Sequence, residues 1–513
     1  MLSRFVPLLP VTLSDYVLRK KAHNINFLRG MLLNSTPEGL ETIGRKKLIA
    51  CFKRAVKYVP HYANFLEKKK IKPSSVHSLN SFLELVPILN KKNYVKTAKT
   101  VDELCFRGNL SSCSLLSRSS GFSGKASSWA KSREEQQESK NFAALGLDLL
   151  FGITHKKTLL IDSFALGSWV SGVDLLMIAD SKCSVVAPGA DINETLDLLI
   201  DMKNEYEQFL IAGTPHFLKF LIEEAIKRKI PLNKFKINIL AGGESFTEDW
   251  RQYMNSLLGN TMYDDNTGFV FSAYGASDLG VTGVNETHES AQIRYSCMKN
   301  KKLREDIFGR FSSTLPMLFQ YDPTKYFIEV NQKAELVFSN CDLKALMPLI
   351  RYNIHDVGGV VSYREMQDIL KKNGVDLKLK APLPFVFVVG RSDGTVNFVG
   401  SIVYPEYVHD ALIKHSSIYE LITGAFRIST KCDQNNNPYL QINIQLKESV
   451  NKTTTLQTKI KSILVDFFSE LDNDFAQNIS LIKSKTKKNP IRVSVYNNKS
   501  YPYIDGIKIK YVE

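Results

Sequence analysis

Residues 211–244 read IAGTPHFLKFLIEEAIKRKIPLNKFKINILAGGE and decide the fold class. The pattern predicts a strand over 211–215, a helix over 216–229 and a second strand that runs into a glycine turn over 237–244. A strand, a helix and a strand in this order are typical of a βαβ unit with parallel strands. The stretch therefore predicts an α/β fold.

The same alternation extends in both directions from this stretch. Helices are expected over 134–150, 175–178 and 194–210, and strands over 159–164, 183–188 and 269–278. From residue 326 the helical pattern fades, and YFIEV, AELVFSN, GGVVSY and PFVFVVG predict a small β-rich subdomain. The large N-terminal part should thus combine mostly parallel βαβ sheets with a β-rich subdomain.

The two ends of the chain differ from this middle part. The N-terminal region, about 1–105, is predicted to be helical, with a helix over 40–70 that Pro60 interrupts. After Gly390 the order strand, helix, strand, strand, helix, strand predicts a small α+β domain of the ferredoxin-like kind. We therefore expect two domains, 1–392 and 393–513, and a solvated loop at the basic run Lys483–Lys488.

Composition excludes several classes of protein. Among the 513 residues 44% are hydrophobic and 23% are charged, which argues against a disordered chain, a collagen or a coiled-coil rod. The formal net charge is +15. Such a surface attracts nucleic acid, anionic membranes or phosphorylated ligands, and it is also what scattered solvated lysines produce.

Cysteine usage and hydropathy point to a cytoplasmic protein. The seven cysteines are scattered without a C-x-x-C pair or a histidine at zinc spacing, which predicts reduced thiols. The apolar patch at the start of the chain contains prolines and is followed by no cleavage site, and the other apolar runs are too short to span a bilayer. We expect no integral membrane segment, while peripheral association stays open.

The strongest local motif is Ser119-Ser120-Gly121-Phe122-Ser123-Gly124-Lys125. Its glycines allow consecutive backbone N–H groups to face one anion, its hydroxyls add donors, and its lysine adds a positive charge. The spacing G-x-x-G-K is two residues shorter than a Walker P-loop. Taken alone, the motif fits a phosphate-binding loop or a flexible loop.

Further motifs follow in order along the chain. They are Ala241-Gly242-Gly243-Glu244, Tyr274-Gly275-Ala276-Ser277-Asp278, Arg351-Tyr352-Asn353-Ile354-His355-Asp356, Gly390-Arg391-Ser392-Asp393-Gly394 and a terminal Gly506/Lys508/Lys510 cluster. The series resembles the adenylate-forming acyl-CoA synthetase superfamily. Within it, Val59-Pro60-His61-Tyr62, Val86–Lys91 and Pro348–Tyr352 resemble the phenylacetate–CoA ligase and capsule-biosynthesis branch, over roughly residues 45–513.

The resemblance implies roles for the matching residues. Asp278 stands at the position of the magnesium ligand, one methylene shorter than the usual Glu, and Asp393 at the hinge between domains. Tyr274 would stack on adenine, and Asp356 would accept hydrogen bonds from the ribose hydroxyls. The nucleotide-binding residues implied in this way are Ser119, Ser120, Gly121, Ser123, Gly124, Lys125, Gly242, Gly243, Glu244, Tyr274, Gly275, Ser277, Asp356 and Arg391.

A lysine near the C-terminus would supply charge in the adenylation step. Domain closure would bring it to the reacting phosphate, where a cation stabilises charge as it develops. Lys508 fits the family pattern with one residue inserted after Gly506, and Lys510 is the alternative. A basic strand at a frayed terminus is the plain structural reading.

The acyl pocket is implied near Phe164–Gly172, and Phe164 and Trp169 are candidates for its wall or are core aromatics. Such a wall suits an aryl or apolar acid. His216 is expected at a helix start. The stretch Asn285–Glu289, which contains His288, is expected to be a solvated loop rather than a metal site.

Some motif positions depart from the family pattern. Phe122 and Ala126 replace a small hydroxyl residue and a proline, and Asn353-Ile354-His355 stands where Arg-Thr-Arg or Arg-Thr-Gly is typical. The residues after the hinge, Asn397 and Phe398, differ as well. Activity is expected, with a slow or repurposed enzyme as the alternative.

Three hypotheses follow for function. The first is ATP- and Mg²⁺-dependent activation of a small carboxylic acid as acyl-AMP, with pyrophosphate release and transfer to coenzyme A. The second transfers the acyl group to a carrier protein, an amine or a sugar in natural-product or polysaccharide synthesis. The third is a non-catalytic nucleotide- or nucleic-acid-binding scaffold, which would show steep salt dependence, although no recognition pattern for nucleic acid supports it. A homodimer stays open.

Overall fold

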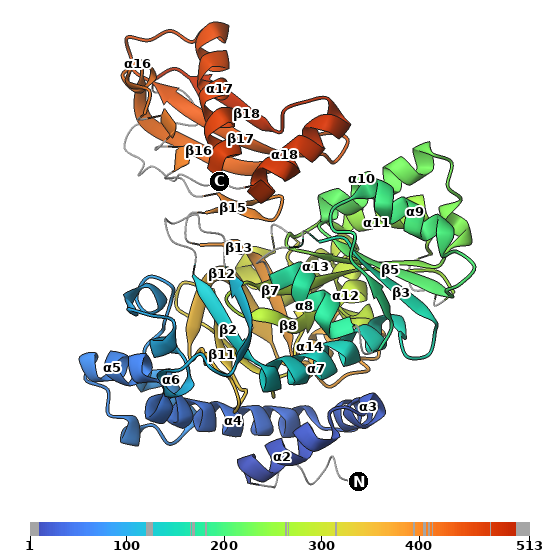
Figure 1. Cartoon of the computed structure of the whole chain (residues 1–513), viewed down its shortest axis with the longest axis vertical. Coiled ribbons are helices and arrows are strands. Elements are labelled where there is room, and N and C mark those ends of the chain that lie inside the picture. The colour runs from blue at the N-terminus through green and yellow to red at the C-terminus, as the bar shows by residue number, and fades with distance from the viewer. Residues whose placement is uncertain are drawn as a thin grey trace. The chain divides into compact units, whose positions relative to one another are not determined.

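The computed structural model describes residues 10–118, 127–164, 166, 170–179, 182–261, 264, 266–312, 315–392, 395–403, 407–408, 411–412, 414–471 and 473–498. These form a mixed α/β structure with one large sheet and a smaller C-terminal region (Figure 1). By their internal contacts the residues divide into two compact units. Unit 1 comprises Met1–Ser119, Ser127–Gly213 and Leu221–Gly390, and unit 2 comprises Ser120–Ala126, Thr214–Phe220 and Arg391–Glu513.

The described part of the N-terminal region is helical, and its helices gather at one side of unit 1 (Figure 1). The predicted helix over 40–70 is two helices, because Pro60 has no N–H to continue the first and its fixed φ suits the first turn of the second. The elements are α2 (Val11–Lys21), α3 (Ile25–Leu33), α4 (Pro37–Tyr58), α5 (Pro60–Lys68), α6 (Leu79–Leu85) and the short 3₁₀ turns η2 (Pro73–Ser75), η3 (Val95–Thr97), η4 (Asp102–Leu104) and η5 (Phe106–Gly108).

The middle of the chain supplies the alternating elements. They are β1 (Cys113–Arg118), β2 (Ser128–Ser132), α7 (Arg133–Phe151), β3 (Thr158–Asp162), α8 (Val170–Ala179), β4 (Ser184–Val186), α9 (Ile192–Asp201), β5 (Gln208–Gly213), α10 (Pro215–Lys227), η6 (Leu232–Lys234), β6 (Ile237–Gly242), α11 (Glu248–Leu258), β7 (Val270–Ala276) and β8 (Gly280–Asn285). The helix expected over 194–210 ends at Asp201, because Gln208 and the residues after it pair with β3 and β6 instead. Tertiary pairing overrides helical periodicity there.

The rest of unit 1 continues the alternation into a β-rich part. It contains α12 (His288–Lys299), α13 (Lys301–Phe308), η7 (Gly309–Phe311), β9 (Met317–Gln320), β10 (Tyr326–Val330), β11 (Glu335–Asn340), β12 (Tyr352–Val361), α14 (Tyr363–Lys372) and β13 (Phe385–Arg391). These strands do not form a separate sheet. They extend the central sheet to the order β10-β11-β12-β13-β9-β8-β7-β6-β5-β3-β4.

The parallel part of this sheet is β4, β3, β5, β6 and β7, and β7–β8, β8–β9, β13–β9, β10–β11 and β11–β12 are antiparallel. Every residue of β3, β5 and β6 is buried, which is why these strands appear in the sequence as nearly continuous apolar runs. One core cluster joins α7 and α8 to these strands, and a second joins α12, α13 and α14 to β9 and β13.

The C-terminal region contains β14 (Val396–Phe398), β15 (Ser401–Val403), α16 (Ser416–Tyr419), β16 (Ile422–Cys432), β17 (Pro438–Leu446), α17 (Thr454–Leu471), α18 (Asn473–Thr486) and β18 (Ile491–Tyr496). The sheet order is β16-β17-β18, with β17 and β18 parallel, whereas β14 and β15 form a two-stranded antiparallel sheet. The basic run expected to be a loop lies partly in a helix, because α18 extends to Thr486.

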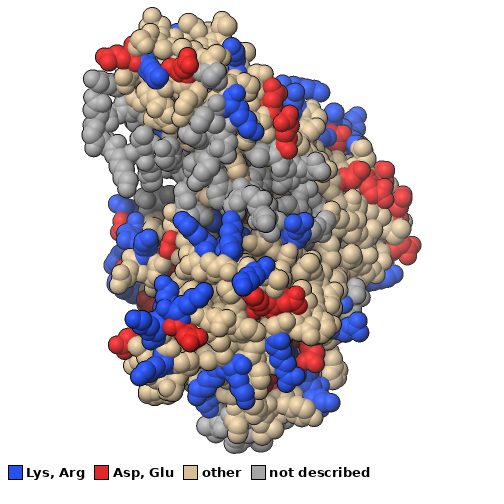
Figure 2. Space-filling view, turned by 60° about the vertical axis from the view of Figure 1, so that its left-hand side comes forward, with Lys and Arg blue, Asp and Glu red and all other residues tan. Residues whose placement is uncertain are grey.

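No helix within the described ranges combines the length and the apolar character needed to cross a membrane. On the face shown in Figure 2, lysine and arginine side chains are interspersed with acidic ones. The positive charge is therefore scattered over that face.

Candidate functional site

The first part of the site is the end of β6 and the neighbouring β7. The two strands are parallel and Gly242 lies opposite Ala273, so the predicted glycine turn lies beside Tyr274. A Cβ on Gly242 would approach the ring of Phe164 to 3.1 Å, and Gly243 has a φ of +82°. Only small residues fit this turn without a shift of its neighbours.

Tyr274 and Asp356 meet, although 82 residues separate them in the sequence. The Tyr274 hydroxyl donates a hydrogen bond of 2.5 Å to Asp356 Oδ2. The tyrosine ring lies near Phe338, with a centroid distance of 6.2 Å and nearly parallel planes, and near Phe319 at 5.6 Å. The structure therefore joins the aromatic residue and the carboxylate that were predicted to contact the nucleoside.

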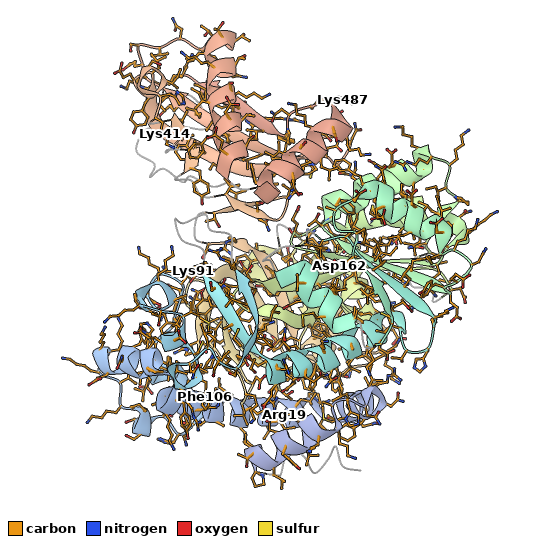
Figure 3. The ribbon with its side chains drawn as sticks, viewed as in Figure 1. Arg19, Lys91, Phe106, Asp162, Lys414 and Lys487 are labelled. Carbon is orange, nitrogen blue, oxygen red and sulfur yellow. The ribbon has the colours of Figure 1, made fainter. Side chains whose placement is uncertain are left out.

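Asp278 follows β7 and is already engaged by two groups. Its Oδ2 accepts a hydrogen bond of 2.8 Å from the Tyr352 hydroxyl, and its Oδ1 lies 3.2 Å from Lys91 Nζ. Lys91 also lies over the ring of Trp129, which packs edge-on against Tyr352. Lys91 is labelled in Figure 3 and comes from the N-terminal helical region.

Lys91 was missed as a site residue in the sequence. Its segment, Val86–Lys91, is typical of the resembled family branch, as is Pro348–Tyr352. The two segments pair: Leu89 N donates to Arg351 O and Asn353 N donates to Leu89 O, both at 2.8 Å. Their shared resemblance to one family branch was the only hint in the sequence that the two segments matter. It could not show that Lys91 contacts Asp278, because that contact joins residues far apart in the sequence.

The donors around Asp278 do not form a ready cation site. Both carboxylate oxygens already have partners, Lys91 Nζ at Oδ1 and the Tyr352 hydroxyl at Oδ2, and no cluster of three or more histidine, cysteine or acidic side chains arranged for a metal occurs in the described part of the chain. A Mg²⁺ ion at Asp278 would compete with the Lys91 ammonium for Oδ1. The magnesium role of Asp278 stays a prediction.

A small cavity of about 40 Å³ lies beside Ser277 and Asp278, with Trp129 and Lys131 also in its wall. The Trp129 indole N–H is buried and has no hydrogen-bond partner among the described residues. Lys131 Nζ lies 2.9 Å from Asp174 Oδ2. A Cβ on Gly280 would come within 2.3 Å of that ammonium, so this glycine makes room for the ion pair.

Phe164 packs in the core cluster that contains Leu160 and Leu240, and it is 8% exposed. Beside it, Asp162 at the end of β3 is fully buried, and burial raises its pKa to about 7 (Figure 3). Asp162 Oδ1 accepts from Phe164 N at 3.1 Å, while Oδ2 has no hydrogen-bond partner within the described ranges. Sequence reasoning missed this buried carboxyl, because a single acidic residue at the end of an apolar strand gives no sign of its burial.

The stretch Asn285–Glu289 is not the solvated loop that was expected. It contains the end of β8 and the start of α12, and the Nε2 of His288 donates to Leu150 O at 3.0 Å while its ring packs edge-on against Phe269 and Phe271. A histidine in a polar-looking segment is here a core residue.

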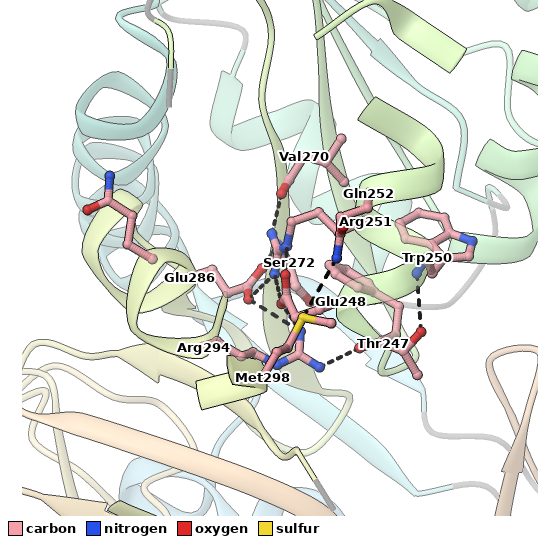
Figure 4. A network of polar contacts seen from close by, with 12 residues as sticks. Thr247, Glu248, Trp250, Arg251, Gln252, Val270, Ser272, Glu286, Arg294 and Met298 are labelled. Atoms are coloured by element: carbon pink, nitrogen blue, oxygen red, sulfur yellow. Dashed lines mark hydrogen bonds and ion pairs between the residues drawn. The ribbon is translucent and has the colours of Figure 1, made fainter. Parts of the chain in front are cut away.

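Glu286 belongs to a buried ionic network that supports β7 (Figure 4). Arg251 donates to Glu248 at 2.9 Å and to Glu286 at 2.6 Å, and Arg294 donates to Glu248 at 2.7 Å. All four charged side chains are at most 2% exposed. Glu286 Oε2 accepts from Ser272 N, and Arg251 donates to Val270 O, so the network fixes the strand that leads to Tyr274.

Several predicted site residues lie outside the described residues. They are Ser119, Ser120, Gly121, Ser123, Gly124, Lys125, Trp169, Asp393, Lys508 and Lys510. The hairpin that flanks the predicted phosphate loop is described: β1 and β2 pair from Cys113↔Ser132 to Arg118↔Ser128. Arg391 ends β13 and donates from Nε to Thr395 Oγ1 at 2.7 Å. Gly275 lies in β7 and Glu244 follows β6.

Comparison with protein-family models and with curated proteins finds no match. Among solved structures, 2-hydroxyisobutyryl-CoA ligase in complex with 2-HIB-AMP and CoA, in its thioesterification state, is similar, with a TM-score of 0.64 and 16% identity over 92% of this chain and 89% of that chain. An open conformation of that ligase with 2-HIB-AMP and CoA gives a TM-score of 0.54 and 14% identity over 93% and 92%. The postadenylation state of the same ligase with 2-HIB-AMP has a TM-score of 0.51 and 15% identity, over 92% of this chain and 89% of that chain. The chain therefore has the adenylate-forming enzyme fold.

Proposed function

We propose that this chain is a cytoplasmic AMP-forming acid–thiol ligase of the phenylacetate–CoA ligase kind. A carboxylate oxygen of the acid attacks the α-phosphorus of ATP, an O–P bond forms, and the bond to pyrophosphate breaks. The sulfur of a thiolate, supplied by coenzyme A, then attacks the acyl carbonyl carbon, a C–S bond forms, and AMP leaves.

The hydrogen-bonded pair of Tyr274 and Asp356 carries the proposal. An aromatic face binds a flat base, and a carboxylate accepts hydrogen bonds from two ribose hydroxyls. The glycine turn at Gly242 lies on the strand next to Tyr274, at the carboxyl ends of parallel strands, where α/β sheets bind ligands. The fold supports the same reading, because a ligase of this fold is known with an acyl-AMP and CoA bound.

Positive charge for the phosphates would come from Lys91 and from the predicted residues Lys125 and Lys508 or Lys510. Lys91 lies against Asp278, so its ammonium is held at the end of β7 rather than free in solvent. A cation held in place before the reaction stabilises developing negative charge without the cost of reorganisation.

The acid is proposed to be an aryl or other apolar carboxylic acid, bound against Phe164 and the predicted Trp169. Phe164 lies against Gly242, so an apolar wall adjoins the turn proposed for the adenine. Contact with this wall would remove the apolar group of the acid from water, which stabilises the bound state.

Pyrophosphate exchange over a panel of acids tests the proposal. The panel should include phenylacetate, benzoate, medium-chain fatty acids and 2-hydroxyisobutyrate, with coenzyme A, a carrier protein and hydroxylamine as separate acceptors. We expect exchange with at least one apolar acid and loss of exchange in Asp356→Ala. Absence of exchange with every acid, together with absence of ATP and AMP binding, would refute it.

The rival scaffold function predicts a steep loss of nucleic-acid affinity as salt increases. On the visible face of Figure 2 the basic residues are mixed with acidic ones, which favours a solvated surface over a phosphate-binding track. Binding of DNA or RNA at 150 mM salt, without ATP binding, would favour the scaffold.

A further inference from the structure

The residue directly before Asp356 has an unusual backbone. His355 has a φ of +68°, in the left-handed region that non-glycine residues rarely adopt. It stands where the resembled family has Arg or Gly, so this chain reaches that conformation with a bulky side chain. Such a conformation persists only where surrounding contacts hold it.

The pairing of β11 and β12 explains why this conformation is needed. Glu335 lies opposite Val357 and Val337 lies opposite Asn353, so two residue steps on β11 face four on β12. The extra residues form a bulge that contains His355 and Asp356. Bulges re-aim side chains near functional sites, and this one presents Asp356 to the Tyr274 hydroxyl.

Glu335 organises the bulge from the neighbouring strand. It is 5% exposed, its Oε1 lies 3.2 Å from His355 Nδ1, and its Oε2 accepts from Asn353 Nδ2 at 2.7 Å. Asn353 Oδ1 in turn accepts from the His355 backbone N–H at 2.7 Å. The histidine is thus held through both its ring and its backbone, and both contacts lead to one carboxylate.

We propose that His355 is a positioning residue for nucleotide binding: the Glu335–Asn353–His355 cluster holds the left-handed bulge that aims the Asp356 carboxylate. The inference rests on the proposed function, because it assumes that the Asp356 carboxylate binds the ribose hydroxyls of the nucleotide. His355 itself does not touch the nucleotide in this account. It acts by fixing where the neighbouring carboxylate lies.

Substitutions that differ in their tolerance of positive φ test the proposal. His355→Val adds a β-branched side chain that resists this conformation, whereas His355→Gly accepts it without strain. Using calorimetry with AMP and with ATP on the full chain, we expect His355→Val to weaken binding at least tenfold. His355→Gly keeps the backbone bond to Asn353 Oδ1 but loses the ring contact with Glu335, so it should weaken binding by only about threefold, less than His355→Val does. The KM for ATP should rise in His355→Val with little change in kcat.

A matched control distinguishes misplacement of the Asp356 carboxylate from the effect of backbone strain elsewhere in the chain. Lys70 also has a positive φ, of +58°, and is exposed at the end of α5, so Lys70→Val adds comparable strain far from the bulge. It should leave AMP affinity unchanged. Equal AMP affinity in His355→Val and the wild type would overturn the inference and leave the ligase function standing, as would equally weakened binding in His355→Val and His355→Gly. Absence of AMP and ATP binding by the wild type would instead refute the proposed function.

Discussion

Single side chains at the edge of the sheet carry charges whose partners were invisible in the sequence. Lys91 and Asp278 form a pair that is partly shielded from solvent, with exposures of 29% and 11%. Removal of either partner leaves the other without its counter-charge in a partly buried place. Both residues belong to the proposed phosphate end of the site.

Lys91→Ala should therefore raise the KM for ATP in pyrophosphate exchange by about tenfold, which corresponds to about 1.4 kcal/mol. Lys92→Ala is the matched control, because Lys92 is the adjacent lysine and is exposed. A double-mutant cycle with Asp278→Asn should show coupling, since the two side chains touch. Additive effects, or an equal loss in Lys92→Ala, would argue against the pair.

The pKa of Asp162 predicts a pH effect on stability. Burial raises this pKa from 3.8 to about 7, so the folded state retains a proton that the unfolded state releases above pH 4. The free energy of unfolding therefore falls as pH rises from about 4 to about 7, and above that range the carboxyl is ionised in both states. Asp162→Asn should therefore exceed the wild type in free energy of unfolding at pH 8 by on the order of 2 kcal/mol.

Urea unfolding at pH 5 and at pH 8 measures this difference, which should shrink at the lower pH. Asp197 lies on the exposed face of α9, so Asp197→Asn should leave the free energy of unfolding unchanged at both pH values. A constant difference between Asp162→Asn and the wild type across this range would show that the carboxyl does not titrate as expected.

At the scale of elements, glycines decide how closely strands and side chains approach. Gly280 and Gly152 both have positive φ, +76° and +65°, but only Gly280 is crowded, by the Lys131 ammonium. A methyl group at Gly280 would displace that ammonium from Asp174, in addition to straining the backbone.

Gly280→Ala should lower the free energy of unfolding by about 3 kcal/mol, and Gly152→Ala by about 1 kcal/mol, because the second carries only the backbone strain. Chemical denaturation of both variants checks the comparison. Equal losses would mean that Lys131 moves aside without cost.

At the scale of the whole molecule, the proposed reaction requires a lysine from the C-terminal segment. We expect Lys508→Ala or Lys510→Ala, but not both, to slow acyl-AMP formation by about a hundredfold or more, since one cation acts on the developing phosphate charge. Thioester formation from chemically supplied acyl-AMP should persist. Full adenylation activity in both single variants would refute the assignment of a closing lysine.

Much of the fold followed from local pattern. The buried runs of β3, β5 and β6 and the break at Pro60 were predictable because apolar periodicity and proline act within a few residues. Within the candidate site, the order of motifs predicted Gly242, Tyr274, Asp278 and Asp356, whose roles stay predictions. Lys91, Asp162 and His355 were not, because their importance depends on partners far away in the chain.

The sequence by itself determined the α/β class, the helical N-terminal region and the candidate nucleotide residues, because composition, periodicity and motif order are local properties. Only the tertiary structure decided that the β-rich strands extend the parallel sheet, that His288 and Glu286 are core residues, and that Lys91 faces Asp278. Strand neighbours and ion-pair partners are chosen by packing over the whole chain, where burial of apolar surface outweighs local preference. The bulge that aims Asp356 arises in this way, from the register between two strands.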